Sequence, residues 1–187
     1  YEVQDEESWY THSKHLLYQK PKSGYYRFPV EMGNKHLIRR LQLGQETPIK
    51  LSFTQSIRTR TQLAGAMGKK LLLDSAEVLQ RLEDKTYLAQ YGLTPETAVC
   101  LFIPNTYEVY WTMSADQLFA RMHKEYLRFW NEERRAKAKA LDLTPVEVAT
   151  LASIVASETN KTAEHPLIAS LYLNRLNKGI ALQACPT

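Results

Sequence analysis

The stretch LTPVEVATLASIVASETN, residues 143–160, decides how the C-terminal half of the chain folds. Thr144 stands at an N-cap position, Pro145 at the first helical position and Glu147 at the third. This is a capping box, with proline where its missing N–H leaves no hydrogen bond unmade. Apolar residues then recur at helical spacing, at Val148, Leu151, Ala152 and Val155. The stretch therefore predicts a helix with one buried apolar face.

Glu158 ends this pattern. It lies three residues after Val155 and seven after Leu151, so at about 100° per residue it falls beside Leu151 on the face predicted to be buried. Glutamate is seldom buried without a partner, and burial raises the pKa of a carboxyl group. A carboxylic acid that is protonated near neutrality suits general acid catalysis. The pattern also leaves open an ordinary surface glutamate at the end of a helix.

A second helix is predicted directly after Asn160. Pro166 fits its first turn and Gly179 closes it, with Leu167, Ile168, Leu171 and Tyr172 on its apolar face. The short connection makes the two helices close neighbours. Three polar residues near the end of this helix are then candidates to face Glu158 and to bind sugar hydroxyl or acetamido groups: Asn174, Arg175 and Gln183. Surface or capping roles are the alternatives for each.

The remainder of the chain predicts an α+β fold. Residues 1–93 mix short strands with helices, and residues 94–187 are mainly helical. The predicted strands are Tyr25–Phe28 and Pro48–Gln55. One predicted helix ends with Gln19, and another begins after Ser114. Between them, helices are predicted over Asn34–Leu43 (capped by Asn34), Thr59–Leu72, about Ser75–Glu83 and Lys85–Tyr91. We expect the chain, which begins at Tyr1 and ends at ACPT, to be a fragment at both ends.

Composition places few limits on function. Of 187 residues 44% are hydrophobic and 24% charged, which is ordinary for a globular protein. A net charge of +4 suits a polyanionic partner, but the basic residues are scattered and no motif that reads nucleic acid occurs. Cys100 and Cys185 lack metal-ligand spacing, and two independent thiols are favoured over a disulfide. No stretch reaches the roughly 18 apolar residues of a membrane span.

Three blocks of the sequence resemble the MltG (YceG-like) family of endolytic murein transglycosylases. LASIVASETN followed by IASLYLNRLNKGIALQACPT resembles the family pattern A-S-I-I/V-E-K-E-T and a helix that ends N-R-L-x-x-G-M-x-L-Q-T/A-D-P-T. Upstream, SGYYRF resembles A-G-T-Y-x-F/L, and FIPNTYEVYW resembles F-x-P-D/N-T-Y/W. The blocks occur in the family's order and span almost the whole chain, and the helical pair is the most specific of them.

Two positions depart from that pattern. Ala156 replaces the first glutamate of the E-K-E-T block, which leaves Glu158 as the single candidate carboxylate. Cys185 replaces the aspartate of the D-P-T block, so that aspartate has no counterpart here.

The resemblance implies a small LysM-like α/β region over 1–93 and a mainly helical catalytic region over 94–187 that is incomplete at its C-terminal end. It implies cleavage of the bond between N-acetylmuramic acid and N-acetylglucosamine to give 1,6-anhydro ends, with Glu158 as acid and then base. Asn105 and Tyr107 would position sugar, although Tyr107 is also a candidate core aromatic. No cofactor or metal is expected.

The resemblance further implies peptidoglycan strands as partner, a link to cell-wall synthesis enzymes, and an N-terminal membrane anchor, outside this sequence, that holds the domain on the periplasmic or wall side. A wall protein that only binds is the first alternative. A pyridoxal-phosphate lyase of the aminodeoxychorismate type is disfavoured, because no strand-borne lysine accompanies a phosphate-binding glycine loop. A nucleic-acid-binding protein is disfavoured further.

Overall fold

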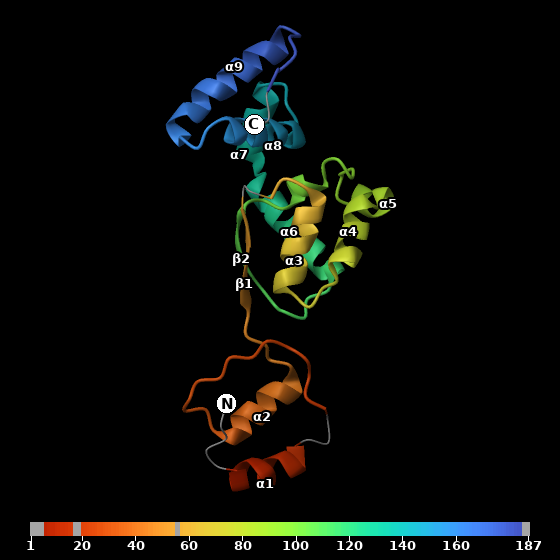
Figure 1. The fold of residues 1–187 in the computed structure, drawn as a ribbon, viewed down its shortest axis with the longest axis vertical. Helices are drawn as coiled ribbons and strands as arrows, with labels where there is room; N and C mark the ends of the chain where they lie inside the picture. Colours follow the sequence, from red (N-terminus) through yellow and green to blue (C-terminus); the bar gives the residue numbers. More distant parts are fainter. Residues whose placement is uncertain (1–5, 17–19, 55–56, 185–187) are drawn as a thin grey trace.

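The computed structural model describes residues 6–16, 20–54 and 57–184. Its elements are α1 (Glu6–Leu16), α2 (Asn34–Leu43), β1 (Ile49–Phe53), α3 (Arg60–Lys70), α4 (Ser75–Glu83), α5 (Lys85–Ala89), the 3-10 helix η1 (Ala98–Leu101), β2 (Asn105–Val109), α6 (Ala115–Phe129), α7 (Glu132–Ala140), α8 (Pro145–Glu158), the 3-10 helix η2 (Thr162–Glu164) and α9 (His165–Asn177). Figure 1 shows three groups along the long axis: α1 with α2, then the sheet with α3–α6, then α7–α9. The mixed α and β content confirms the predicted α+β class.

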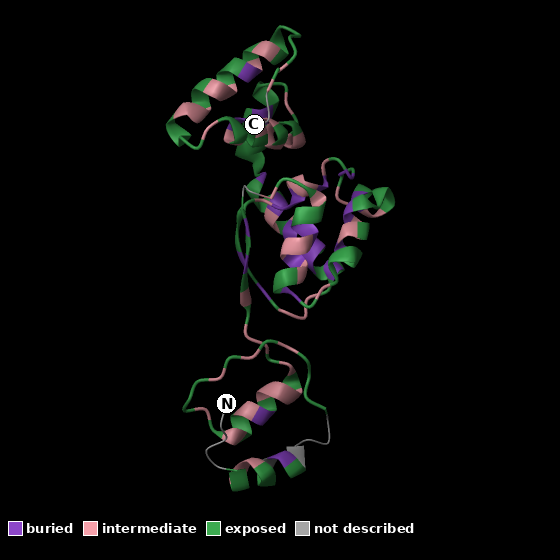
Figure 2. Cartoon of the chain, viewed as in Figure 1, coloured by how far each residue is buried: buried purple, intermediate pink, exposed green. Residues whose placement is uncertain are grey.

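The middle group holds the main hydrophobic core. β1 and β2 pair antiparallel, with Leu51 opposite Tyr107 and Phe53 opposite Asn105. Alternate residues of both strands point inward, and α3, α4 and α6 supply the other side of the core. Purple, buried segments concentrate here in Figure 2, whereas the two ends of the molecule are mostly exposed or half-buried. Phe119, Leu118 and Met122 of α6 are fully buried.

Local sequence signals set the helices of this group. Thr59 and Ser114 each form a capping box with the glutamine three residues later, and Asp74 accepts a hydrogen bond from the backbone N–H of Ala76. The predicted helices over 59–72, 75–83, 85–91 and from 114 onward are confirmed to within three residues at each end. α2 is also confirmed, with Gly44 in the left-handed region at φ 68° after its last residue.

Three details of the prediction are wrong. Gly33, not Asn34, is the N-cap of α2, and no side chain caps that helix. Tyr25–Phe28 is not a strand, because Glu46 and Thr47 side chains accept its N–H groups in place of a neighbouring strand. β2 was not predicted as a strand at all. The predicted helix end at Gln19 lies outside the described residues, and α1 is described to Leu16.

The boundary predicted after Leu93, between the regions 1–93 and 94–187, lies within the middle group. β1 comes from one side of that position and β2 from the other, and they share a sheet. Leu93 itself is buried in the common core. The strand pairing and the core thus join residues 49–53 to residues 105–109.

The described helices are shorter or less apolar than a membrane span requires. No single one of them is long and apolar enough to cross a bilayer; α7 and α8 meet the requirement only together, and that pair is bent by 77°.

Candidate active site

The candidate site lies at the C-terminal end of α8, where the chain turns back into α9. The capping box predicted for α8 is confirmed: Thr144 Oγ1 accepts from the Glu147 N–H at 3.2 Å, and Glu147 accepts from the Thr144 N–H at 2.7 Å. The Thr144 hydroxyl also donates to Glu147 Oε2 at 2.8 Å. The bond from the Thr144 N–H and then the bond from its hydroxyl lower the pKa of the Glu147 carboxyl group. α9 begins with Pro166 in its first turn, and Gly179 follows it at φ 64°, as predicted.

Glu158, the last residue of α8, is hydrogen-bonded to α9. The hydroxyl of Tyr172 donates to Glu158 Oε1 at 2.7 Å. Tyr172 is 5% exposed, so its ring is packed between the helices while its hydroxyl reaches the carboxyl group. The contact between α8 and α9 confirms that the short connection makes them neighbours. In Figure 1 the two helices lie next to each other at one end of the molecule.

The predicted burial of Glu158 is wrong. Its side chain is exposed, and on the face predicted to be buried only Val155 is buried; Val148 and Leu151 are half-buried and Ala152 is exposed. The cause lies in what surrounds the helix: the main packing of α8 is against α9, α7 and η1, and Val146 and Val148 near its start also contact the core of the middle group. Its apolar stripe is longer than the surface that covers it. Burial therefore does not prepare this carboxyl group as an acid.

The turn that follows Glu158 is fixed by side chains. Thr159 Oγ1 donates to Glu164 Oε2 at 2.8 Å and accepts from the Lys161 N–H at 3.1 Å. The Thr159 carbonyl oxygen lies 3.1 Å from His165 Nε2, and Lys161 Nζ lies 3.4 Å from Glu164 Oε1. Glu164, the nearest other carboxylate in sequence, is thus engaged by the turn. These bonds hold the end of α8 in a defined position relative to the start of α9.

Arg175 and Gln183 are brought together, but not onto Glu158. Arg175 Nη1 donates to the carbonyl oxygen of Leu182 at 2.6 Å, and it lies 3.3 Å from the Ala181 carbonyl oxygen and 3.4 Å from Gln183 Oε1. Gln183 adopts φ 51°, in the left-handed region. The guanidinium therefore organises the loop after α9. Its predicted role as a sugar ligand stays a prediction.

Asn174 lies on another face of α9. It follows Tyr172 by two residues, or about 200° around the helix, so it points away from the side on which Tyr172 meets Glu158. Its side chain is exposed. The structure does not bring Asn174 to the carboxyl group.

Asn105 and Tyr107 belong to β2 in the middle group. Asn105 is exposed and its Oδ1 accepts from the Thr106 N–H at 2.8 Å. Tyr107 is 6% exposed, packs against Phe53 and donates its hydroxyl to the Ile103 carbonyl oxygen at 2.7 Å. The structure thus places Tyr107 in the role of core aromatic, with no face open for a sugar.

Sequence reasoning assigned Tyr172 to packing and missed its hydroxyl. The signal was present, because a buried tyrosine usually has a polar partner for its O–H, and Glu158 was predicted to lie on the facing helix. Among the described residues no three His, Cys, Asp or Glu side chains gather as metal ligands would. Cys100 is a free thiol whose pKa is raised by burial, and Cys185 lies outside the described ranges.

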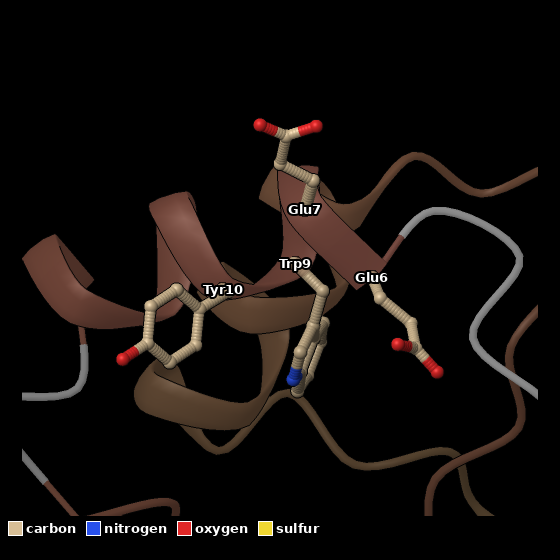
Figure 3. A pocket seen from close by; sticks show the side chains of 4 residues that line it. All are labelled: Glu6, Glu7, Trp9 and Tyr10. Atoms are coloured by element: carbon tan, nitrogen blue, oxygen red, sulfur yellow. The ribbon is translucent and has the colours of Figure 1, made fainter.

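A hollow occurs elsewhere, on α1. Glu6, Glu7, Trp9 and Tyr10 line it (Figure 3). α1 lies at the end of the molecule opposite to α9 in Figure 1, so this hollow is separate from the candidate site.

A family model described as YceG-like matches residues 2–187. The chain belongs to the YceG-like family. A crystal structure of a YceG-like protein from Listeria monocytogenes resembles this YceG-like chain with a TM-score of 0.64 and 22% identity, over 94% of this chain and 63% of the Listeria one. At that identity the likeness concerns the fold alone.

Two curated relatives carry the name endolytic murein transglycosylase. They come from Streptococcus pneumoniae, from serotype 2 strain D39 / NCTC 7466 and from strain ATCC BAA-255 / R6. Each is 26% identical to this YceG-like chain over 204 residues, which covers 92% of the chain and 36% of the relative. The chain therefore spans little more than a third of the length of these relatives.

Proposed function

We propose that this chain carries part of a peptidoglycan lytic transglycosylase, with Glu158 as its acid and base. The observation that carries the proposal is the exposed Glu158 carboxyl group, held at the junction of α8 and α9 and open to a polymeric substrate. Membership of the YceG-like family and the name of the pneumococcal relatives supply the reaction class.

The proposed chemistry needs one carboxyl group. Glu158, in its acid form, gives its proton to the glycosidic oxygen between N-acetylmuramic acid and N-acetylglucosamine, and the bond from that oxygen to the muramyl anomeric carbon breaks. The muramyl primary hydroxyl then bonds to the anomeric carbon and loses its proton to the Glu158 carboxylate. The products are a 1,6-anhydro end and an N-acetylglucosamine end. No water is consumed, and Glu158 finishes protonated as it began.

The exposure of Glu158 shapes this proposal. Because the carboxyl group is exposed, a glycan bound over α8 and α9 would have to exclude water from it. Hydrolytic glycosidases pair two carboxyl groups with a water molecule. Glu164, the nearest second candidate, is already bonded to Thr159 and Lys161, which favours the single-carboxyl route.

The other roles follow from the same proposal. Asn105, Asn174, Arg175 and Gln183 are offered as glycan contacts, and the region over 1–93 as LysM-like. We place the protein in the cell envelope, attached to the inner membrane and facing the periplasm or wall, where it would meet wall-synthesis enzymes.

The test is digestion of purified murein by the full-length protein and its Glu158→Gln variant, with the products read by mass spectrometry. We expect anhydromuramyl ends from the wild type and a loss of at least about 100-fold in Glu158→Gln, because the amide can neither give nor take the proton. Glu133→Gln is the matched control, since Glu133 lies exposed on α7 and pairs with Lys137. It should leave the products unchanged.

Two other outcomes of the digestion would indicate a different function. Reducing ends in place of anhydro ends would indicate a hydrolase with a second carboxylate, and Glu164 would be tested next. Absence of products from a folded protein that still binds murein would favour the wall-binding alternative, to which the Ala156 departure from the family pattern lends some weight.

A further inference from the structure

Tyr172 is buried, yet its hydroxyl meets the one carboxyl group that the proposed reaction uses. The ring is 5% exposed, and the hydroxyl lies 2.7 Å from Glu158 Oε1. That distance is within the range of a strong O–H to oxygen hydrogen bond. The bond joins residues fourteen positions apart, from the last residue of α8 to the middle of α9.

We propose that Tyr172 is the positioning residue for Glu158: its hydroxyl holds Oε1, so that the acid proton sits on Oε2, the oxygen left for the glycan. This inference rests on the proposed function and names a residue that the family resemblance did not single out.

The two side chains differ in flexibility. Glu158 is exposed and has three rotatable bonds, so without a partner its carboxyl group would sample many positions. Tyr172 has two, and its ring is fixed by packing. A rigid donor that fixes a flexible carboxyl group makes the productive geometry available before the substrate arrives.

The two oxygens of the carboxyl group differ as well. In a carboxylic acid the carbonyl oxygen is the better hydrogen-bond acceptor, and the other oxygen carries the proton. A donor fixed on Oε1 therefore favours the form in which Oε2 carries the proton. After transfer, the same donor stabilises the carboxylate that must take a proton from the muramyl hydroxyl. One hydrogen bond serves both halves of the reaction.

The turn on the other side of Glu158 supports this positioning. Thr159, the next residue, is bonded to Glu164 and Lys161. The backbone at the end of α8 is thus held from the turn while the carboxyl group is held from α9. A bond that only holds the two helices together would not require the acceptor to be the catalytic carboxylate. Kinetic measurements can separate this structural role from the positioning role.

The experiment compares Tyr172→Phe, Tyr172→4-aminophenylalanine, Glu158→Gln and Tyr26→Phe in the full-length protein, with kcat and KM for formation of anhydro ends. The phenylalanine keeps the ring and removes the donor, and the amino analogue restores an N–H donor. Tyr26 is the matched control, because its hydroxyl donates to the Lys22 carbonyl oxygen at 2.9 Å in a segment distant from α8 in sequence.

We expect kcat to fall about ten-fold in Tyr172→Phe with KM unchanged within about two-fold, because the lost bond acts on the reacting group. The amino analogue should recover most of the loss, and Tyr26→Phe should behave as the wild type. Wild-type kcat in Tyr172→Phe beside an inactive Glu158→Gln would overturn the inference alone. A raised KM at unchanged kcat would also overturn it, since Tyr172 would then serve binding or structure.

Folding is followed by thermal melting of each variant. If Tyr172→Phe no longer melts cooperatively, the amino analogue decides: a folded and active analogue supports the inference, and a folded but inactive one overturns it. If Glu158→Gln keeps full activity, the proposed function itself fails, which is distinguishable from failure of the inference.

Discussion

Two glycines of α3 give a prediction with an internal control. An alanine Cβ at Gly65 would meet nothing within 4 Å. At Gly68 it would collide with Ser75 Oγ and lie 3.3 Å from both Ser75 Cβ and the Leu73 carbonyl oxygen. Gly68 is therefore where α3 and α4 approach each other, whereas Gly65 faces open space. The same substitution should change stability in opposite directions at these two positions.

The magnitudes follow from the two environments. Alanine gains about 0.5–1 kcal/mol over glycine inside a helix, so Gly65→Ala should stabilise the protein by that amount. Gly68→Ala gains the same but forces apart packed atoms, at a cost of about 1–3 kcal/mol. Its net effect should be a loss of about 1 kcal/mol. For a protein of this size, each kcal/mol shifts the melting temperature by about 2–4 °C.

The assay is urea unfolding of the wild type and both variants, followed by circular dichroism. Ser75→Ala removes the oxygen that collides, so the double variant Gly68→Ala with Ser75→Ala should recover part of the loss, as a double-mutant cycle would show. If Gly68→Ala is as stabilising as Gly65→Ala, the close approach of α3 and α4 at this point is refuted.

Two further predictions concern a helix cap and an ion pair. Thr144→Ala should destabilise α8 by about 1 kcal/mol through loss of the cap, measured as faster amide hydrogen exchange in α8, while Thr144→Ser should keep the protection. Arg81 Nε donates to Asp116 at 2.8 Å, and this bond, followed by one from Tyr87, lowers the pKa of the Asp116 carboxyl from its ordinary 3.8. The contribution to stability is therefore present above pH 3.8 and is lost as the pH falls through the lowered value. The difference in free energy of unfolding between wild type and Asp116→Asn should be small, since Asp116 is 61% exposed. This difference should disappear in acid. A difference that grows in acid would contradict the stabilising role of the bond between Arg81 and Asp116.

The elements that carry local signals could be predicted from the sequence. α8 was predicted from Thr144, Pro145 and Glu147, and the capping box is present in the structure. β1 was predicted from strict alternation between Ile49 and Phe53. Such features depend on residues a few positions apart, so tertiary packing does not alter them.

What could not be predicted depends on distant partners. The Tyr25–Phe28 segment has strand-forming residues but finds side-chain acceptors on Glu46 and Thr47 instead of a second strand. β2 follows Pro104 and carries mixed polar residues, and it becomes a strand because β1 offers a partner in register. Strand formation needs a neighbour, and the local sequence does not specify which one.

For the candidate site, too, the local features were predicted from the sequence and the features that depend on distant partners were not. Periodicity correctly predicted that Glu158 ends a helix and that a second helix lies beside it. It also predicted a buried side chain, whereas the structure shows Glu158 exposed. A hydrophobic pattern reports the face that a helix is able to bury, whereas burial depends on what lies against that face. Under the proposed function this changes the origin of the acid: the protein supplies a held carboxyl group through Tyr172, and the substrate supplies the exclusion of water. Glycan binding would then itself complete the site, because a glycan that leaves α8 and α9 uncovered also leaves Glu158 in contact with water.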